Sequence, residues 1–119
     1  MPFKDPQDAL EDILENIARI ERFVNGLDEQ SFYLDDKTVF AVQYALLAIS
    51  EAAHRLGGQA EVLCPGMPWP DIRGLGNWLR HGYDSLNPEI IWATVQNDLG
   101  PLQLAAMIAL NRMEGPEPR

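Results

Sequence analysis

The fold is decided by residues 5–26, DPQDALEDILENIARIERFVNG, which carry a helical pattern from end to end. Asp5 suits the N-cap position and Pro6 the first turn, while Gly26 offers a stop at the other end. Between them, apolar side chains recur at the spacings of three and four that are typical of an amphipathic helix. They are Leu10, Ile13, Leu14, Ile17, Ile20 and Val24. The stretch therefore predicts a helix with one buried face.

A second helix is expected at residues 37–56, after a connection (27–36) that leaves room for one short turn. Its apolar residues form two seams. The first consists of Val39, Val42, Leu46, Ile49, Ala53 and Leu56, and the second of Phe40, Tyr44 and Leu47. Two seams indicate a helix with partners on more than one side, and a second chain could be one of these partners.

Two more helices complete the pattern, and we find no convincing strand. Residues 57–70 are expected to form a loop, followed by a third helix at about 69–80 and a fourth that begins at the cap Asn87. Gly100 and Pro101 should kink or break the fourth helix, because proline cannot donate the interior hydrogen bond. The sequence thus predicts an all-α protein, an up-and-down four-helix bundle with a kinked C-terminal helix.

The composition limits the classes of function. A length of 119 residues predicts one domain, which we place at residues 1–113 ahead of a flexible tail at 114–119. The net charge of −9 argues against a protein that coats DNA, although it leaves room for a small basic site. Cys64 alone cannot form an internal disulfide, and no apolar run is long enough to cross a membrane. We therefore expect a cytoplasmic protein, and no motif for a metal or a cofactor is found.

The stretch with the most chemistry is residues 71–84, DIRGLGNWLRHGYD. Each residue of a helix advances by about 100°, so Arg73, Asn77, Arg80 and His81 should fall within a sector of about 100°. Arginine can hold phosphate oxygens, and histidine can move a proton near neutral pH. Asn77 could position the imidazole or the substrate.

This group of residues suits the cleavage of RNA without a metal ion. His81 would deprotonate the 2′-hydroxyl or protonate the leaving oxygen, while Arg73 or Arg80 would stabilise charge on the phosphoryl group. Tyr83 could bind a phosphate or stack on a base. A structural role fits the same residues, because Arg80 and His81 are cations suited to a helix C-terminus and Tyr83 could be a buried aromatic.

Residues 76–84, GNWLRHGYD, resemble the signature of the HepT-like branch (DUF86) of the HEPN superfamily. Segments on either side resemble the helices of that family, in the same order. They are DALEDILENI (8–17), AISEAAHRL (48–56), PWPDIRG (68–74) and PEIIWATVQNDL (88–99). The resemblance covers about residues 5–110.

The resemblance implies a HEPN-like four-helix bundle that forms a homodimer, with the motifs of two protomers facing a shared cleft. It also implies a toxin that cuts RNA without a metal. The implied antitoxin is a nucleotidyltransferase of the MNT type, which binds the toxin and in some systems adenylylates the motif tyrosine. In this chain, the resemblance assigns catalysis to His81 and catalytic support or AMPylation to Tyr83. Asn77 matches the polar residue that follows the motif arginine.

The chain departs from the family pattern at one position. The motif arginine is expected directly before Asn77, where this sequence has Gly76. Seven residues separate Arg73 from His81, and Arg80 is adjacent to it, whereas the family pattern has four to six between. Two other hypotheses therefore stay open. One is a non-catalytic binding partner of a nucleotidyltransferase, which Gly76 favours, and the other is a structural dimer without a role toward RNA.

Several other polar residues have weaker signals. Glu51 and Arg55 are spaced i,i+4 and are expected to form an ion pair at the surface or in an interface. For Glu51 and His54, a role in the cleft is the alternative to surface or dimer packing. Cys64 lies in a proline-flanked loop without an activating base, so we do not nominate it as a nucleophile.

Overall fold

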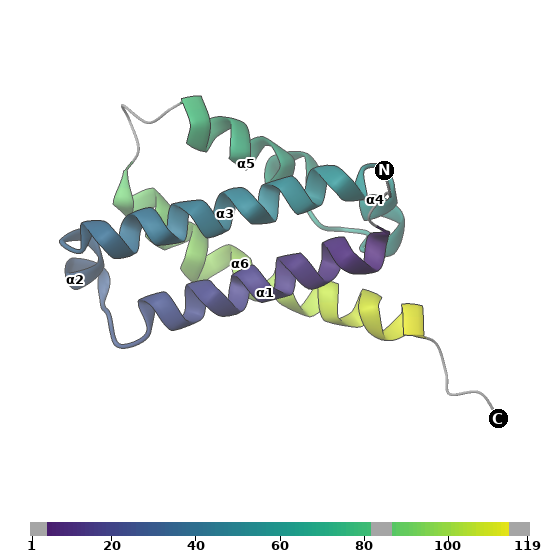
Figure 1. Cartoon of the computed structure of the whole chain (residues 1–119), viewed down its shortest axis with the longest axis horizontal. Helices are drawn as coiled ribbons and strands as arrows, with labels where there is room; N and C mark the ends of the chain where they lie inside the picture. Colours follow the sequence, from purple (N-terminus) through teal and green to yellow (C-terminus); the bar gives the residue numbers. More distant parts are fainter. Residues whose placement is uncertain (1–4, 82–86, 115–119) are drawn as a thin grey trace.

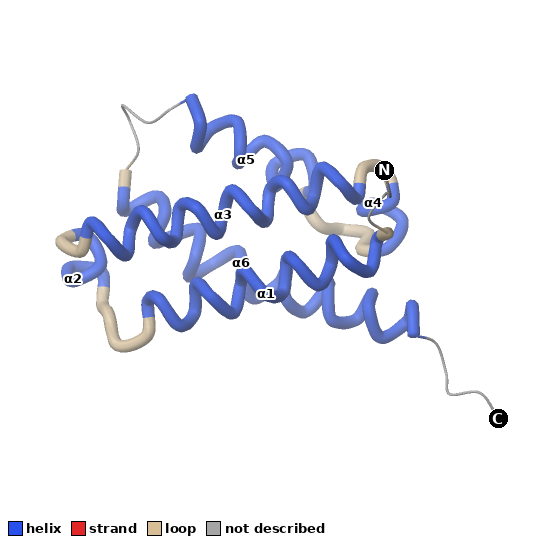
Figure 2. The backbone as a smooth tube through the Cα atoms, viewed as in Figure 1, coloured by secondary structure: helices blue, strands red, loops and turns tan. Residues whose placement is uncertain are grey.

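The computed structural model describes residues 5–81 and 87–114, and within them every regular element is a helix (Figures 1 and 2). The elements are α1 (Pro6–Val24), α2 (Glu29–Tyr33), α3 (Asp36–Leu56), α4 (Gln59–Leu63), α5 (Trp69–His81) and α6 (Pro88–Glu114). Figure 1 shows that the four long helices α1, α3, α5 and α6 run in alternate directions. The predicted all-α, up-and-down four-helix architecture is therefore confirmed.

Helix α1 begins and packs as its sequence predicts. The Asp5 carboxylate accepts a hydrogen bond from the backbone N–H of Asp8 at 3.0 Å, and Pro6 opens the first turn. The expected apolar face is buried, with Leu10, Ile13, Ile17 and Ile20 fully inaccessible to solvent. Gly26, two residues beyond the helix, has a φ of +82°, which residues with a side chain rarely adopt. The local signals and the tertiary packing thus agree.

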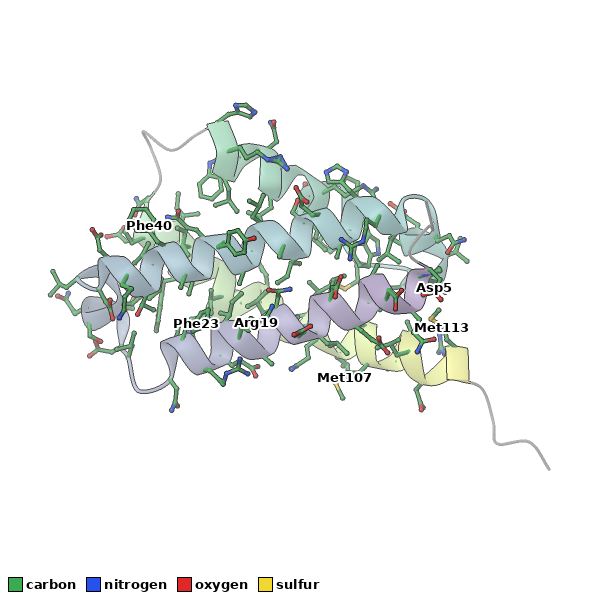
Figure 3. The ribbon with its side chains drawn as sticks, in the orientation of Figure 1. Asp5, Arg19, Phe23, Phe40, Met107 and Met113 are labelled. Atoms are coloured by element: carbon green, nitrogen blue, oxygen red, sulfur yellow. The ribbon has the colours of Figure 1, made fainter. Side chains whose placement is uncertain are left out.

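Helix α3 is the centre of the bundle, because α1 packs on one side of it and α5 on another. Asp35 caps it by accepting hydrogen bonds from Thr38 N at 3.1 Å and Thr38 Oγ1 at 2.7 Å. The first predicted seam of α3 is buried, whereas Phe40 and Tyr44 of the second seam are 64% and 73% exposed. Figure 3 shows Phe40 at the surface of the molecule. Leu47, the third residue of this seam, is partly buried against the core, so Phe40 and Tyr44 form the exposed part of the seam.

Helix α6 lies antiparallel to α1 and closes the bundle (Figure 1). Near its start, Trp92 packs against the fully buried Phe32 of α2, with ring centroids 5.1 Å apart. Helix α2 is the short turn expected in the connection at residues 27–36. Among the described residues, none of the helices combines the length and the apolar character needed to span a membrane.

Three expectations about helix boundaries need correction. Helix α4 lies within residues 57–70, which we expected to be a loop, and its buried Ala60 anchors it to the bundle. Gly100 and Pro101 do not break α6, because both face solvent while the buried neighbours Leu99 and Leu102 keep the helix docked. Helix α6 also reaches Glu114, the first residue of the expected tail. Residues 115–119 lie outside the described ranges.

Candidate functional site

The candidate residues are carried by α5, which packs mainly on α3 (Figure 1). Trp69, Gly76 and Leu79 are its buried residues and hold it against the bundle. Asn77, Arg80 and His81 are exposed at its C-terminal end. Three of the residues predicted to share one sector therefore share an accessible surface.

Hydrogen bonds from α3 to the backbone of α5 fix how the two helices face each other. The fully buried Ser50 donates from Oγ to the carbonyl oxygen of Arg73 at 2.9 Å, and Ser50 Oγ also accepts from the N–H of Gly76 at 2.9 Å. One turn further along α3, His54 Nε2 lies 3.1 Å from the Arg73 carbonyl oxygen. Ser50 and His54 therefore set the rotation of α5 about its own axis.

Gly76, at the position where the resemblance led us to expect an arginine, lies in close contact with α3. A Cβ atom there would lie 2.7 Å from Ser50 Oγ, 3.2 Å from Ser50 Cβ and 3.3 Å from Leu47 Cδ1. An arginine at 76 would therefore start inside the contact with α3. Such a side chain requires α5 to move or the Ser50 hydrogen bonds to break.

Arg73 is directed to the opposite end of α5 from His81. Its Nη2 atom lies 2.8 Å from Glu61 Oε2 of α4, and its Nη1 atom donates to the carbonyl oxygen of Gly57 at 3.3 Å. The hydrogen bond from Arg73 lowers the pKa of the Glu61 carboxyl. The eight residues from Arg73 to His81 correspond to about 12 Å along the helix axis. The structure does not bring the Arg73 side chain to His81.

Arg80 is adjacent to His81 and is held by a carboxylate of α3. Its Nη2 atom lies 3.0 Å from Glu51 Oε2, and the two side chains are 44% and 55% exposed. The expected pairing of Glu51 with Arg55 is wrong, because Arg55 instead forms an ion pair with Asp12 of α1. Glu51 and Arg55 thus each pair with a residue of another helix and not with each other.

Two other sequence-based expectations have different outcomes. Tyr83, expected to support catalysis or to be modified, lies outside the described residues. Cys64 is buried, and its Sγ atom lies 3.5 Å from the carbonyl oxygen of Ala105. Burial raises the pKa of the Cys64 thiol, which disfavours the nucleophilic thiolate. The geometry therefore supplies no reason to nominate Cys64.

Sequence reasoning missed Ser50, and for Glu51 it allowed a role in the cleft but missed the partner, Arg80. Both belong to α3, more than twenty residues from their partners on α5. One signal was available for Ser50, which is a polar residue between the buried Ile49 and Ala52. A buried hydroxyl needs a hydrogen-bond partner, and here the partner is the backbone of another helix.

An apolar cavity of about 520 Å³ separates part of α5 from α6. Its apolar lining comes from α3, α5 and α6 and from the segment that precedes α5. The lining includes Leu46, Ile49, Met67, Ile72, Leu75, Leu99 and Leu102. Two carboxylates, Asp71 and Asp98, lie at its edge. Helix α5 is thus attached along α3 and more loosely toward α6.

Comparisons with known proteins agree on one family. The sequence model of the family described as "Ribonuclease HepT-like" matches residues 13–108. "Probable ribonuclease HepT" of Thermococcus cleftensis is 35% identical over 97 residues, which cover 82% of this chain and 88% of that protein. "Putative RNase MJ0127" of Methanocaldococcus jannaschii is 39% identical over 97 residues, which cover 82% of this chain and 80% of that protein. No solved structure matches the chain significantly.

Proposed function

Because this chain belongs to the HepT-like family of ribonucleases, we propose that it cuts RNA without a metal ion, with His81 as the proton-transfer group. The observation that carries the proposal is that the consecutive residues Arg80 and His81 are both exposed at the C-terminal end of α5. A guanidinium group binds phosphate oxygens, and an imidazole exchanges protons near neutral pH. Exposure at a helix end leaves both groups accessible to a long polymer such as RNA.

The proposed reaction is an internal transfer of the phosphoryl group. The imidazole of His81 takes the proton of the 2′-hydroxyl, and the resulting 2′-oxygen attacks the adjacent phosphorus. The bond from phosphorus to the 5′-oxygen breaks, and this leaving oxygen receives a proton from a second acid. Arg80 stabilises the negative charge on the phosphoryl oxygens during the transfer. Asn77, one turn before His81 on the exposed surface, orients the substrate or the imidazole.

A homodimer supplies the second acid in this proposal. Two copies that place their α5 ends toward a shared cleft bring two His81 side chains to one phosphodiester, one as base and one as acid. The exposed part of the α3 seam, Phe40 and Tyr44, supports this assembly because apolar side chains of this size gain from burial. The same seam leads along α3 toward Glu51, which contacts the site.

The remaining parts of the proposal concern control of the activity. We infer that the protein acts as a toxin and that an MNT-type nucleotidyltransferase serves as its antitoxin. Tyr83, two residues after His81, is the proposed site of AMPylation. The support for this control is the resemblance of residues 76–84 to the family signature. Mass spectrometry after co-expression with the nucleotidyltransferase is expected to find AMP on Tyr83 and to find none after Tyr83→Phe.

The ribonuclease proposal is tested by cleavage of RNA in EDTA. We expect His81→Ala to lower the rate by about 100-fold or more, the usual contribution of a general acid or base. Arg73→Ala is the matched control, because it removes a cation of the same helix that contacts α4 instead. Equal cleavage by the wild type and His81→Ala would refute the proposed mechanism.

The second candidate function is a non-catalytic binding partner of a nucleotidyltransferase. The observation that favours it is Gly76, which replaces the motif arginine with a packing contact. This function predicts no cleavage of RNA by the wild type, together with stable co-purification with the nucleotidyltransferase. Expression without the partner separates the two candidates, since only a toxin slows growth of the host.

A further inference from the structure

Gly76 and Arg80 lie one helical turn apart on the side of α5 that faces α3. This spacing helps to decide whether Arg73 or Arg80 binds phosphate. We propose that Arg80 is the phosphate-binding arginine and that Glu51 of α3 is the positioning residue that holds its guanidinium group. The inference rests on the ribonuclease function proposed above. In this inference, Arg80 and Glu51 together take over the function of the arginine that was expected at position 76.

The first step of the argument is the backbone. Ser50 bonds to both the Arg73 carbonyl oxygen and the Gly76 N–H, so α5 cannot rotate about its axis without losing one buried and one part-buried hydrogen bond. With that rotation fixed, position 76 faces the α3 backbone and leaves no room for a long side chain. Position 80 is four residues on, about 6 Å further along the axis and on nearly the same side. It is the next position from which an arginine can reach the edge of the contact with α3.

The second step is the side chain. Arg80 engages Glu51 through Nη2 at 3.0 Å, and the described part of the chain supplies no other partner for its guanidinium group. Arginine carries five N–H donors in a planar fork, so one bond to a carboxylate leaves donors for a phosphate. The pair is about half exposed, which keeps these donors accessible. Glu51 thus restricts the orientation of Arg80 without using up its binding capacity.

The third step compares the two arginines. Arg73 uses both terminal nitrogens on Gly57 and Glu61, and it is the less exposed of the two. Arg80 is adjacent to His81 in the chain, whereas Arg73 precedes it by about 12 Å along the axis. Along the helix axis, Arg80 is therefore the arginine nearer to a phosphodiester bound at His81, whereas the guanidinium group of Arg73 contacts Glu61 of α4.

Glu51 can affect RNA binding in two opposite ways, by repelling the phosphate or by holding the guanidinium group of Arg80 in place. A carboxylate beside a phosphate is repulsive, so removal of Glu51 would strengthen RNA binding if repulsion were its main effect. A positioning role predicts the opposite sign, because an unrestrained guanidinium loses more side-chain entropy on binding phosphate. Glu51→Gln separates charge from geometry, since the amide oxygen still accepts the hydrogen bond from Arg80.

The experiment measures single-turnover cleavage of RNA and, separately, binding of an oligonucleotide whose 2′-oxygens are methylated and which cannot be cleaved. We expect Arg80→Ala to weaken binding at least about tenfold. The slope of the logarithm of the binding constant against the logarithm of the salt concentration should become shallower by about one, which corresponds to one lost phosphate contact. Glu51→Ala should lower the cleavage rate severalfold, and Glu51→Gln should restore most of it. Glu61→Ala is the matched control, because it removes a carboxylate from the other arginine of α5.

The outcomes separate this inference from the ribonuclease proposal. Binding and cleavage unchanged by Arg80→Ala would overturn the assignment of Arg80, and gains in Glu51→Ala would overturn the positioning role of Glu51. A larger loss in Glu61→Ala than in Glu51→Ala would overturn both. If no variant or wild type cleaves RNA, the ribonuclease proposal fails, and the binding data on the methylated oligonucleotide still decide the role of Arg80. Circular dichroism checks that the variants keep their helices.

Discussion

At the scale of single residues, the contact between Ser50 and Gly76 fixes how α5 is placed against α3. Glycine inside a helix costs about 1 kcal/mol relative to alanine, so its presence at 76 needs a compensating gain. The gain is the approach of α3, which lets Ser50 Oγ reach two backbone groups of α5. Gly74, two residues earlier, is exposed, and a Cβ atom added there would meet no atom within 4 Å, so it brings no comparable gain.

The two glycines should respond oppositely to alanine. Gly74→Ala is expected to raise the free energy of unfolding by about 0.5–1 kcal/mol through helix propensity alone. Gly76→Ala gains the same propensity, but the new Cβ would displace Ser50 and weaken two hydrogen bonds of about 1 kcal/mol each, with overpacking in addition. We expect a net loss of about 1–3 kcal/mol, measured by urea denaturation.

A double variant provides the control for this prediction. In a Ser50→Ala background, the hydroxyl that meets the new Cβ is gone, so Gly76→Ala should cost less than it does in the wild type. Equal costs in the two backgrounds would mean that the contact with Ser50 does not explain the glycine.

The residues of the site differ in how far the sequence could predict them. Helical periodicity suffices to place Asn77, Arg80 and His81 on one exposed surface, because all three belong to one helix. Periodicity could not show that Arg73 turns toward α4, since its partners Gly57 and Glu61 belong to other segments. The pairing of Arg80 with Glu51 was hidden for the same reason.

At the scale of elements, agreement is best where local signals and burial coincide. Helix α1 and helix α3 each have an acidic cap and an apolar seam that faces the core. Of the kink or break expected at Pro101, a break is excluded, because buried leucines on both sides of Pro101 keep α6 continuous. Helix α4 has five residues, too few for a periodic pattern to be visible.

The helix caps make a prediction about pH. Hydrogen bonds from the side chain and backbone of Thr38 lower the pKa of Asp35, and hydrogen bonds from Ser31 lower that of Asp28. A carboxyl with a lowered pKa in the folded state stabilises the fold above its unfolded pKa of about 4. This stabilisation is lost as the pH falls through the folded pKa. We therefore expect the free energy of unfolding to decline below about pH 4.

Asp35→Asn tests the origin of this decline. Asparagine also caps helices but does not titrate, so the variant should lose less stability than the wild type between about pH 7 and about pH 3. Urea denaturation at the two pH values measures the difference. An identical decline in both proteins would show that the Asp35 cap contributes nothing to acid sensitivity.

At the scale of the whole molecule, an acidic chain carries the candidate site in a short stretch without acidic residues. The chain has 18 acidic and nine basic residues, yet the segment from Ile72 to His81 contains Arg73, Arg80 and His81 and no acid. The acidic body disfavours non-specific binding to nucleic acid. The C-terminal end of α5 carries Arg80, which is paired with Glu51, next to His81 in the sequence. The exposed seam of α3 lies on the same helix as the Glu51 that contacts this region.

The α3 seam makes a prediction about assembly. Phe40→Glu should convert a dimer into a monomer, because a carboxylate buried in an apolar interface lacks its hydration. Sedimentation velocity of wild type and variant measures the change. Leu104→Glu is the control, since Leu104 is a comparably exposed apolar residue (60%) on α6. Dissociation by Leu104→Glu but not by Phe40→Glu would place the interface on α6 instead.

The loose attachment of α5 has a consequence for how the protein can be inactivated. Three buried residues and the hydrogen bonds from α3 hold this helix, and a cavity separates part of it from α6. Proteins open locally at a lower free energy than the one that unfolds them completely, and sparsely packed elements open first. The candidate site can therefore be dismantled while α1, α3 and α6 remain assembled. Heat or a bound protein would then abolish the proposed activity in a chain that still retains most of its helical content.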